Sequence, residues 1–201
     1  SQSEFINVTI NPEPVIDPGL DATVCSDGSV GIIMASDGIS VAAATFNLIS
    51  ISVDAGLIAG GGNVAAANGV ANNYFAGDTY TNKTLGPLTV TYEVRGVSGA
   101  GCVGDSEFIV ATINPEPVVS NSLDATVCSD NAVGINLATD AASIGALNYN
   151  LVSINVPAGL TPDGSNAIVS NGVAANYIAS DLFTNTTNGA INVTYEVQAV
   201  S

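Results

Sequence analysis

The sequence predicts an all-β protein made of two tandem antiparallel β-sandwich units. Three observations predict this fold class: a repeat with a period of 103 residues, short segments in which apolar residues alternate with polar ones, and no sustained 3.6-residue periodicity. A period of 103 residues is about the length of one sandwich domain. The class therefore follows from patterning, before any single residue is interpreted.

The repeat predicts the domain boundaries. Three strings recur at the same offset without a gap: INPEPV from Ile10 and Ile113, DATVCSD from Asp21 and Asp124, and VTYEV from Val90 and Val193. We expect one unit over residues 11–113 and a second over residues 114–201, with residues 1–10 as the last strand of a preceding unit. The Asn-Pro-Glu-Pro segments that open both units predict stiff, extended connectors, because proline fixes φ and removes a backbone donor.

Strands are expected at matching places in the two units. In the first unit they are predicted over residues 46–53, 70–75, 88–94 and 107–113. The Asn-Gly pairs that begin at Asn68 and Asn171 predict type I′ hairpin turns, since both residues tolerate a positive φ. Aromatic residues at apolar alternation positions are expected in the cores rather than as platforms for carbohydrate stacking: Phe5, Phe46, Tyr74, Tyr80 and Tyr92, each with an aromatic counterpart in the next repeat.

Composition excludes several classes of function. The chain has 18 acidic and two basic residues, a formal net charge of -16, so we expect no nucleic-acid partner. No run of about 18 apolar residues is present, so we expect no membrane insertion. The sequence lacks histidine, which excludes Ser-His catalysis, and the repeated Glu93 and Glu196 occupy outward strand positions. The chain is therefore not expected to be an enzyme.

Three cysteines can be placed on the repeat. Cys25 and Cys128 are equivalent, whereas the counterpart of Cys102 would fall four residues beyond Ser201. We expect a disulfide between Cys25 and Cys102, with Cys128 bonded to a partner outside the sequence; the alternative is three free, buried thiols. A disulfide requires an oxidising compartment, which predicts an extracellular or cell-surface location.

Repeated aspartates suggest a calcium site as the one candidate for a bound cofactor. The candidate ligands are Asp21, Asp27 and Asp37 and their counterparts Asp124, Asp130 and Asp140. Calcium binds carboxylate and carbonyl oxygens, but aspartate also caps turns by accepting bonds from its own backbone. No EF-hand-like spacing is present, so both interpretations stay open.

One long string indicates a family. VTYEVRGVSGAGCVGDSEFIVATINPEPVV, from Val90 to Val119, contains a strand, a Gly-rich hairpin with a cysteine, a second strand and an Asn-Pro-x-Pro linker, and a VCSD segment follows. With these features the chain resembles the PKD-like and Ig-like repeats of very large secreted surface proteins of Bacteroidota, including gliding-motility-type adhesins. The resemblance covers essentially the whole chain, twice, and implies an immunoglobulin-like sandwich, export to the cell surface and a role as a stalk, filament or adhesin. Many of those relatives carry a central Trp where this chain has Phe46 and Tyr149.

The two ends of the sequence show complementary patterns. Residues 4–10, EFINVTI, align with residues 107–113, EFIVATI, and the second unit stops before its own last strand. The residues expected to act in strand donation are Glu4, Phe5, Ile6, Val8 and Ile10. Either one polypeptide runs on through the missing strand, or separate chains polymerise head to tail and one chain completes the second unit of the next.

These patterns predict a structural repeat module of an extracellular filament or cell-surface adhesin stalk, assembled end to end. The expected partners are neighbouring copies of the same chain, and β-strand complementation between subunits is one route of assembly. The alternative is an adhesion module that binds a glycan or a protein through its inter-strand loops.

Overall fold

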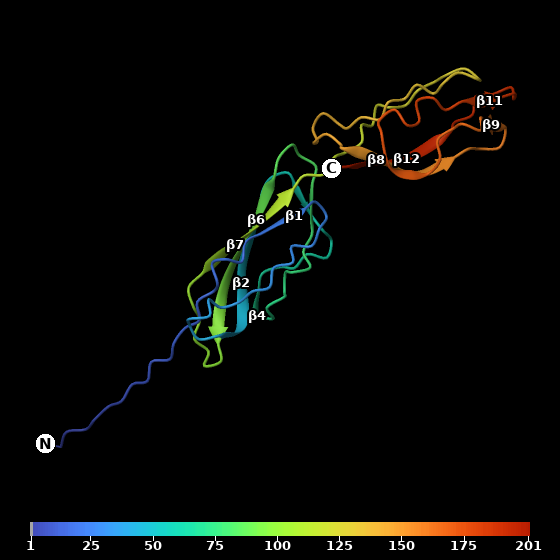
Figure 1. Ribbon diagram of the computed structural model, residues 1–201. Coiled ribbons are helices and arrows are strands. Elements are labelled where there is room, and N and C mark those ends of the chain that lie inside the picture. The colour runs from blue at the N-terminus through green and yellow to red at the C-terminus, as the bar shows by residue number, and fades with distance from the viewer. Residues whose placement is uncertain (1) are drawn as a thin grey trace. The chain divides into compact units, whose positions relative to one another are not determined.

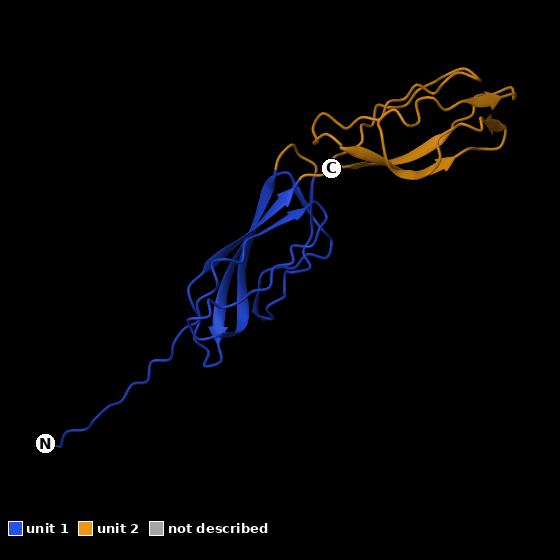
Figure 2. Cartoon of the chain, viewed as in Figure 1, with its two compact units in different colours: residues 1–82, 87–114 blue, residues 83–86, 115–201 orange. Residues whose placement is uncertain are grey.

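A computed structural model describes residues 2–201 and confirms the all-β class, since these residues form strands β1 to β12 and no helix. The chain divides into two compact units (Figure 2): unit 1 is Ser1–Asn82 with Pro87–Asn114, and unit 2 is Lys83–Gly86 with Pro115–Ser201. Across the described residues there is no helix with the length and hydropathy that a membrane crossing requires.

Unit 1 contains a five-stranded and a two-stranded sheet (Figure 1). Its strands are β1 (Ala22–Cys25), β2 (Ala43–Val53), β3 (Leu57–Ala59), β4 (Ala67–Val70), β5 (Tyr80–Asn82), β6 (Leu88–Ser98) and β7 (Glu107–Asn114). The larger sheet has the order β1-β7-β6-β2-β4, and β3 pairs with β5. All pairs are antiparallel except β1 with β7, which is parallel. Strand β7 is therefore held on both edges.

The alternation in β6 and β7 builds the core of unit 1. Val90, Tyr92 and Val94 of β6 are fully buried, because every second side chain of a strand points to the same face of its sheet. The Tyr92 ring stacks on Phe75 with 4.1 Å between the ring centroids. Phe46 and Tyr80 are also buried, so these aromatics pack in the core as expected, whereas Phe5 is exposed.

Unit 2 repeats this arrangement with fewer paired strands and a smaller core. Its strands are β8 (Asn148–Asn155), β9 (Leu160–Pro162), β10 (Ser170–Val173), β11 (Phe183–Asn185) and β12 (Thr194–Val200). They form a three-stranded sheet of order β10-β8-β12 and a two-stranded β11-β9 sheet. The buried apolar residues of this unit are Leu137, Tyr149, Leu151, Val173 and Ile178.

The units differ where β7 lies in unit 1. Strand β6 lies between β7 and β2, whereas its counterpart β12 pairs with β8 alone and is an edge strand. Strand β12 begins at Thr194, three residues later than the repeat predicts from Leu88. Residues 125–128, the counterpart of β1, form no strand. Both differences have one cause: β1 pairs only with β7, and the first residues of β6 also rely on β7 as a neighbour.

Two local predictions are wrong. The Asn68-Gly69 pair lies inside β4, where Phe46 faces Val70 and Leu48 faces Ala67, so one extra residue bulges from the strand. Gly69 has φ +68° and donates its N–H to Asn47 Oδ1 at 2.9 Å. Strand β4 also ends at Val70, and the rest of the predicted 70–75 strand forms turns. Asn-Gly supplies the positive φ in a bulge here instead of in a hairpin turn.

Candidate functional site

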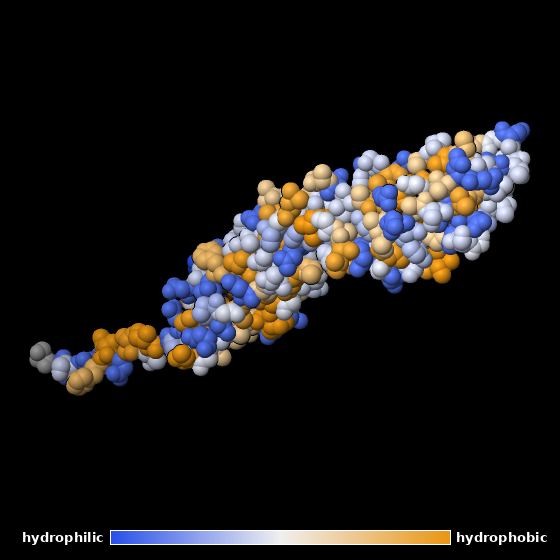
Figure 3. Space-filling view, turned by 45° about the horizontal axis from the view of Figure 1, so that its top comes forward, coloured by the Kyte–Doolittle hydropathy of each residue, from blue (hydrophilic) through white to orange (hydrophobic). Residues whose placement is uncertain are grey.

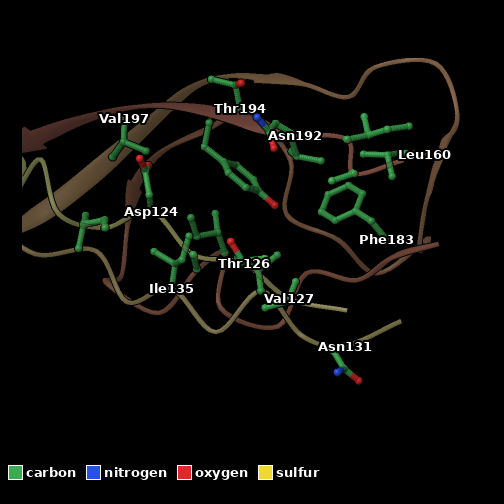
Figure 4. A pocket seen from close by; sticks show the side chains of 18 of the residues that line it. Asp124, Thr126, Val127, Asn131, Ile135, Leu160, Phe183, Asn192, Thr194 and Val197 are labelled. Carbon is green, nitrogen blue, oxygen red and sulfur yellow. The ribbon is translucent and has the colours of Figure 1, made fainter. Parts of the chain in front are cut away.

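The candidate site is an open groove on unit 2, with a volume of about 750 Å³. One wall is the segment from Leu123 to Ser129 and the other runs from Ala190 to Tyr195 and Val197. Figure 4 shows Asp124 and Val197 at one end of this groove and Leu160 and Phe183 at the other. Its apolar lining includes Ile135, Leu137 and Ile178, which belong to the core of unit 2 or pack against it. The groove therefore opens the core of this unit to solvent.

The same space in unit 1 is filled by β7. The inward side chains of this strand, Ile109, Ala111 and Ile113, are at most 1 % exposed. Strand β7 pairs antiparallel with β6 from Leu88 to Val94 and parallel with the whole of β1. Unit 1 thus shows how a single strand can close a groove of this kind, with backbone bonds on both edges and three apolar side chains pointing inward.

The N-terminal segment has the sequence pattern of β7 but pairs with no strand. Residues 2–10 form no strand, and Figure 3 shows hydrophobic surface along this extended stretch. Ile6, Val8 and Ile10 are 89 %, 76 % and 84 % exposed. By the repeat they correspond to Ile109, Ala111 and Ile113. Apolar side chains with this exposure are costly in water, so the segment has the properties of a strand without its sheet.

Two polar side chains recognise the backbone of β7 in unit 1. Asp21 Oδ1 accepts the N–H of Val110 at 2.8 Å, and Asn82 Nδ2 donates to the carbonyl of Ile113 at 2.8 Å. The counterpart of Asp21 in unit 2, Asp124, is exposed and lines the groove.

The counterpart of Asn82 makes a different contact. Asn185 Nδ2 donates to the carbonyl of Gly189, 3.0 Å away in its own loop. Its backbone N–H is nevertheless bound by Ser129 Oγ, as that of Asn82 is by Ser26 Oγ. The backbone around Asn185 is therefore anchored as that of Asn82 is, and its amide group bonds within its own loop. Sequence reasoning did not assign a backbone contact to either asparagine, and their recurrence at the repeat offset is the signal that could have found it.

A buried carboxylate lies in each core. Asp78 accepts bonds from the Val64 N–H at 2.9 Å and from the Tyr92 hydroxyl at 3.1 Å, and the Tyr80 hydroxyl lies 3.1 Å from that of Tyr92. Burial raises the pKa of Asp78 and of both tyrosines. In unit 2, Asp181 accepts from Ala167 N–H at 2.7 Å and from the Tyr195 hydroxyl at 2.8 Å. These carboxylates organise the cores and do not face the groove.

The expected disulfide between Cys25 and Cys102 is not present, because all three cysteines are free. Cys25 ends β1 opposite Asn114, the last residue of β7, whereas Cys102 lies in the turn that precedes the first residue of β7, Glu107. The length of β7 therefore separates them, roughly 20 Å or more at ~3.3 Å per residue. A disulfide needs Cα atoms within about 7 Å. The repeat offset alone could not show that the two cysteines lie at opposite ends of one strand.

The six candidate calcium ligands are not brought together. Within residues 2–201, no group of three or more carboxylates and thiols is arranged to hold a metal ion. Asp21 binds a backbone N–H of β7, Asp27 and Asp130 accept the hydroxyls of Thr81 and Thr184, and Asp124 lines the groove. Asp37 and Asp140 accept N–H groups from the turns that follow them. Only the contacts of Asp37 and Asp140 correspond to the capping interpretation of the repeated aspartates.

The repeated glutamates each bind serine hydroxyls. Glu93 accepts from Ser50 at 3.0 Å and from Ser106 at 2.8 Å, and these bonds lower its pKa. Glu196 accepts from Ser153 at 2.9 Å. Neither glutamate lines the groove on unit 2.

Comparisons of the chain with protein-family models, with curated proteins and with solved structures found no match.

Proposed function

We propose that this chain is a structural module of an extracellular filament or cell-surface stalk, built from two immunoglobulin-like sandwich units. Copies join head to tail when the segment Glu4–Ile10 of one copy enters the open groove on unit 2 of the next. One observation carries this proposal: the groove occupies the place of β7, and the exposed segment has the sequence pattern of β7. The extracellular location rests on the resemblance to secreted repeat proteins.

Unit 1 supplies the register of the contact. In that unit Ile109, Ala111 and Ile113 face Tyr92, Val90 and Leu88 across the antiparallel pair. Shifted by the repeat, the proposed pairs are Ile6 with Tyr195, Val8 with Val193, and Ile10 with Ile191. On its other edge the segment runs parallel to residues 125–128, which then form the strand equivalent to β1.

The polar contacts follow the same register. Asp124 accepts the N–H of Asn7, as Asp21 accepts that of Val110. Asn185 donates one N–H of its amide group to the carbonyl of Ile10, as Asn82 donates to that of Ile113. The exposed segment of one copy thus supplies backbone partners to an edge strand and apolar side chains to a groove on another copy.

The contact is heterologous, because the donor surface and the acceptor surface are different parts of the chain. Each copy carries one donor segment in unit 1 and one acceptor groove in unit 2. A heterologous contact that does not close into a ring extends into a fibre. A filament or stalk is therefore the expected product of repeated strand donation.

The test compares two substitutions on adjacent residues of the segment. Val8→Asp places a carboxylate at an inward position and should abolish assembly of the full chain. Thr9→Asp adds the same charge at an outward position and should leave assembly largely intact. Light scattering and negative-stain microscopy measure the assemblies. Equal assembly by both variants would contradict strand donation.

A self-complemented variant tests the groove itself. Ser201 is the counterpart of Ser98, the last residue of β6, so a copy of residues 99–114 appended after Ser201 supplies unit 2 with its own last strand. This variant should stay monomeric and unfold at a higher temperature than the original chain. Continued polymerisation would show that the groove is not the joint. If the original chain is itself monomeric at all concentrations, the groove is filled by another segment and the proposal fails.

A further inference from the structure

Cys102 marks the point where the donor segment leaves unit 1. Its Sγ lies 3.8 Å from the carbonyl oxygen of Asn11, the residue that follows the donor segment. The Cys102 side chain is partly exposed and its thiol is free. Cys102, in the β6–β7 turn, therefore lies next to the end of the donor segment in the same chain.

Cys128 marks the matching point beside the groove. In unit 1, its counterpart Cys25 pairs with Asn114, and the next residue, Ser26, donates its N–H to the Asn114 carbonyl at 2.9 Å. Shifted by the repeat, Cys128 pairs with Asn11 of the donor copy, and Ser129 donates to the Asn11 carbonyl. Cys128 is exposed and free.

Both cysteines therefore converge on one carbonyl group. The oxygen of Asn11 is contacted by Cys102 of its own chain and, in the assembled pair, by the residue directly after Cys128 of the acceptor. We propose that Cys102 of the donor copy and Cys128 of the acceptor copy form a disulfide that locks each strand-donation joint. This inference rests on the proposed function, because only the inserted segment brings the two thiols together.

The bond forms by thiol–disulfide exchange with an external organic disulfide as oxidant. The Cys128 thiol loses its proton to solvent, and the thiolate attacks one sulfur of the organic disulfide, which breaks and releases one organic thiolate. The Cys102 thiolate then attacks the Cys128 sulfur of this mixed disulfide, forms the Cys102–Cys128 bond and releases the second organic thiolate. Two cysteine thiols are oxidised and one organic disulfide is reduced to two thiols.

Each copy contributes Cys102 to one joint and Cys128 to the next. Cys25 lies opposite Asn114 of its own β7, so both test chains carry Cys25→Ser to keep its thiol out of the reaction.

The experiment uses two full-length chains with one cysteine each. The donor chain carries Cys25→Ser and Cys128→Ser and retains Cys102; the acceptor chain carries Cys25→Ser and Cys102→Ser and retains Cys128. They are assembled together under reducing conditions, assembly is confirmed by light scattering, and oxidised glutathione replaces the reductant. Non-reducing electrophoresis should show a covalent dimer of one donor and one acceptor chain, with little dimer from either chain alone. The chain with all three cysteines should give a ladder.

A directional control separates a templated bond from random collision. Val8→Asp in the donor chain should reduce the covalent dimer at least tenfold, because that chain inserts its segment. The same substitution in the acceptor chain should leave the dimer unchanged, because that chain supplies only the groove. Loss of dimer from both placements, or equal homodimers from the acceptor chain alone, would overturn the disulfide.

The two proposals fail in different ways. Assembly without the mixed dimer would overturn the disulfide and leave strand donation standing. Failure to assemble under reducing conditions would overturn both. Peptide mapping of the dimer should identify Cys102 linked to Cys128, and any other linkage would contradict the register taken from unit 1.

Discussion

Truncating Ile6 to alanine is the sharpest probe of strand donation. In the free chain Ile6 is 89 % exposed, so Ile6→Ala should change the free energy of unfolding by no more than about 0.5 kcal/mol. In the joint it takes the place of Ile109, which is 1 % exposed. The substitution should therefore leave the fold intact and weaken only the contact between copies.

The size of the effect follows from that burial. Replacing a fully buried isoleucine with alanine costs about 2–4 kcal/mol, which weakens binding ~30-fold to ~700-fold. Phe5 is the matched control, since its counterpart Phe108 stays 59 % exposed in the complete sheet of unit 1. Although phenylalanine is larger, Phe5→Ala should cost only about 1 kcal/mol, or roughly fivefold.

Calorimetric titration measures both values. Synthetic peptides of residues 2–11, with the original sequence, Ile6→Ala or Phe5→Ala, are titrated into the chain that lacks residues 1–10. The trimmed chain is a suitable receptor because residues 2–10 belong to no strand. A Phe5→Ala loss equal to or larger than the Ile6→Ala loss would refute the register, since it would place the other face of the segment in the groove.

Three further predictions concern single residues. Burial raises the pKa of Asp78, so its stabilising contribution is complete below the unfolded-state pKa and declines as the pH rises through the higher folded-state value. In urea denaturation, Asp78→Asn should therefore gain stability relative to the original chain from about pH 4 to about pH 7. The opposite trend would contradict a raised pKa. Asn185→Ala should weaken binding of the 2–11 peptide about fivefold by removing one hydrogen bond of about 1 kcal/mol, and unchanged affinity would show that Asn185 does not bond the inserted segment. Gly69→Ala should cost about 1 kcal/mol because the φ of Gly69 is +68°, although no atom lies within 4 Å of the added Cβ. Gly61→Ala also places its Cβ in open space and should be neutral. Equal costs for the two variants would remove the conformational explanation.

The pattern of the repeat predicted the features that depend on local alternation. The strands at Leu88 and Glu107 lie where period-2 alternation placed them, because alternation reports which face of a strand is buried. The likeness of residues 4–10 to residues 107–113 was visible for the same reason. The groove that matches this segment required the structure, because it is formed by segments that are distant in the sequence.

The predictions that failed depend on distance or on a neighbour. Equivalence of Cys25 and Cys128 was correct in the repeat, but pairing Cys25 with Cys102 assumed that both lie at one end of the sheet. Asn68-Gly69 indicates a positive φ, and alternation cannot tell whether a hairpin or a bulge uses it. The strand predicted from residue 191 begins only at Thr194, because alternation cannot show which neighbouring strand is present.

The position of β7 between two partners also bears on how unit 1 withstands mechanical load. Strand β7 pairs with β6 over seven residues and with β1 over four, and its last residue, Asn114, leads into the connector. Tension along the axis of β7 would load the hydrogen bonds of both edges in shear. Bonds loaded in shear break together, whereas bonds peeled from one end break one after another, so extraction of this strand requires a large force. A donated strand held in the same register would give each joint the same resistance to pulling.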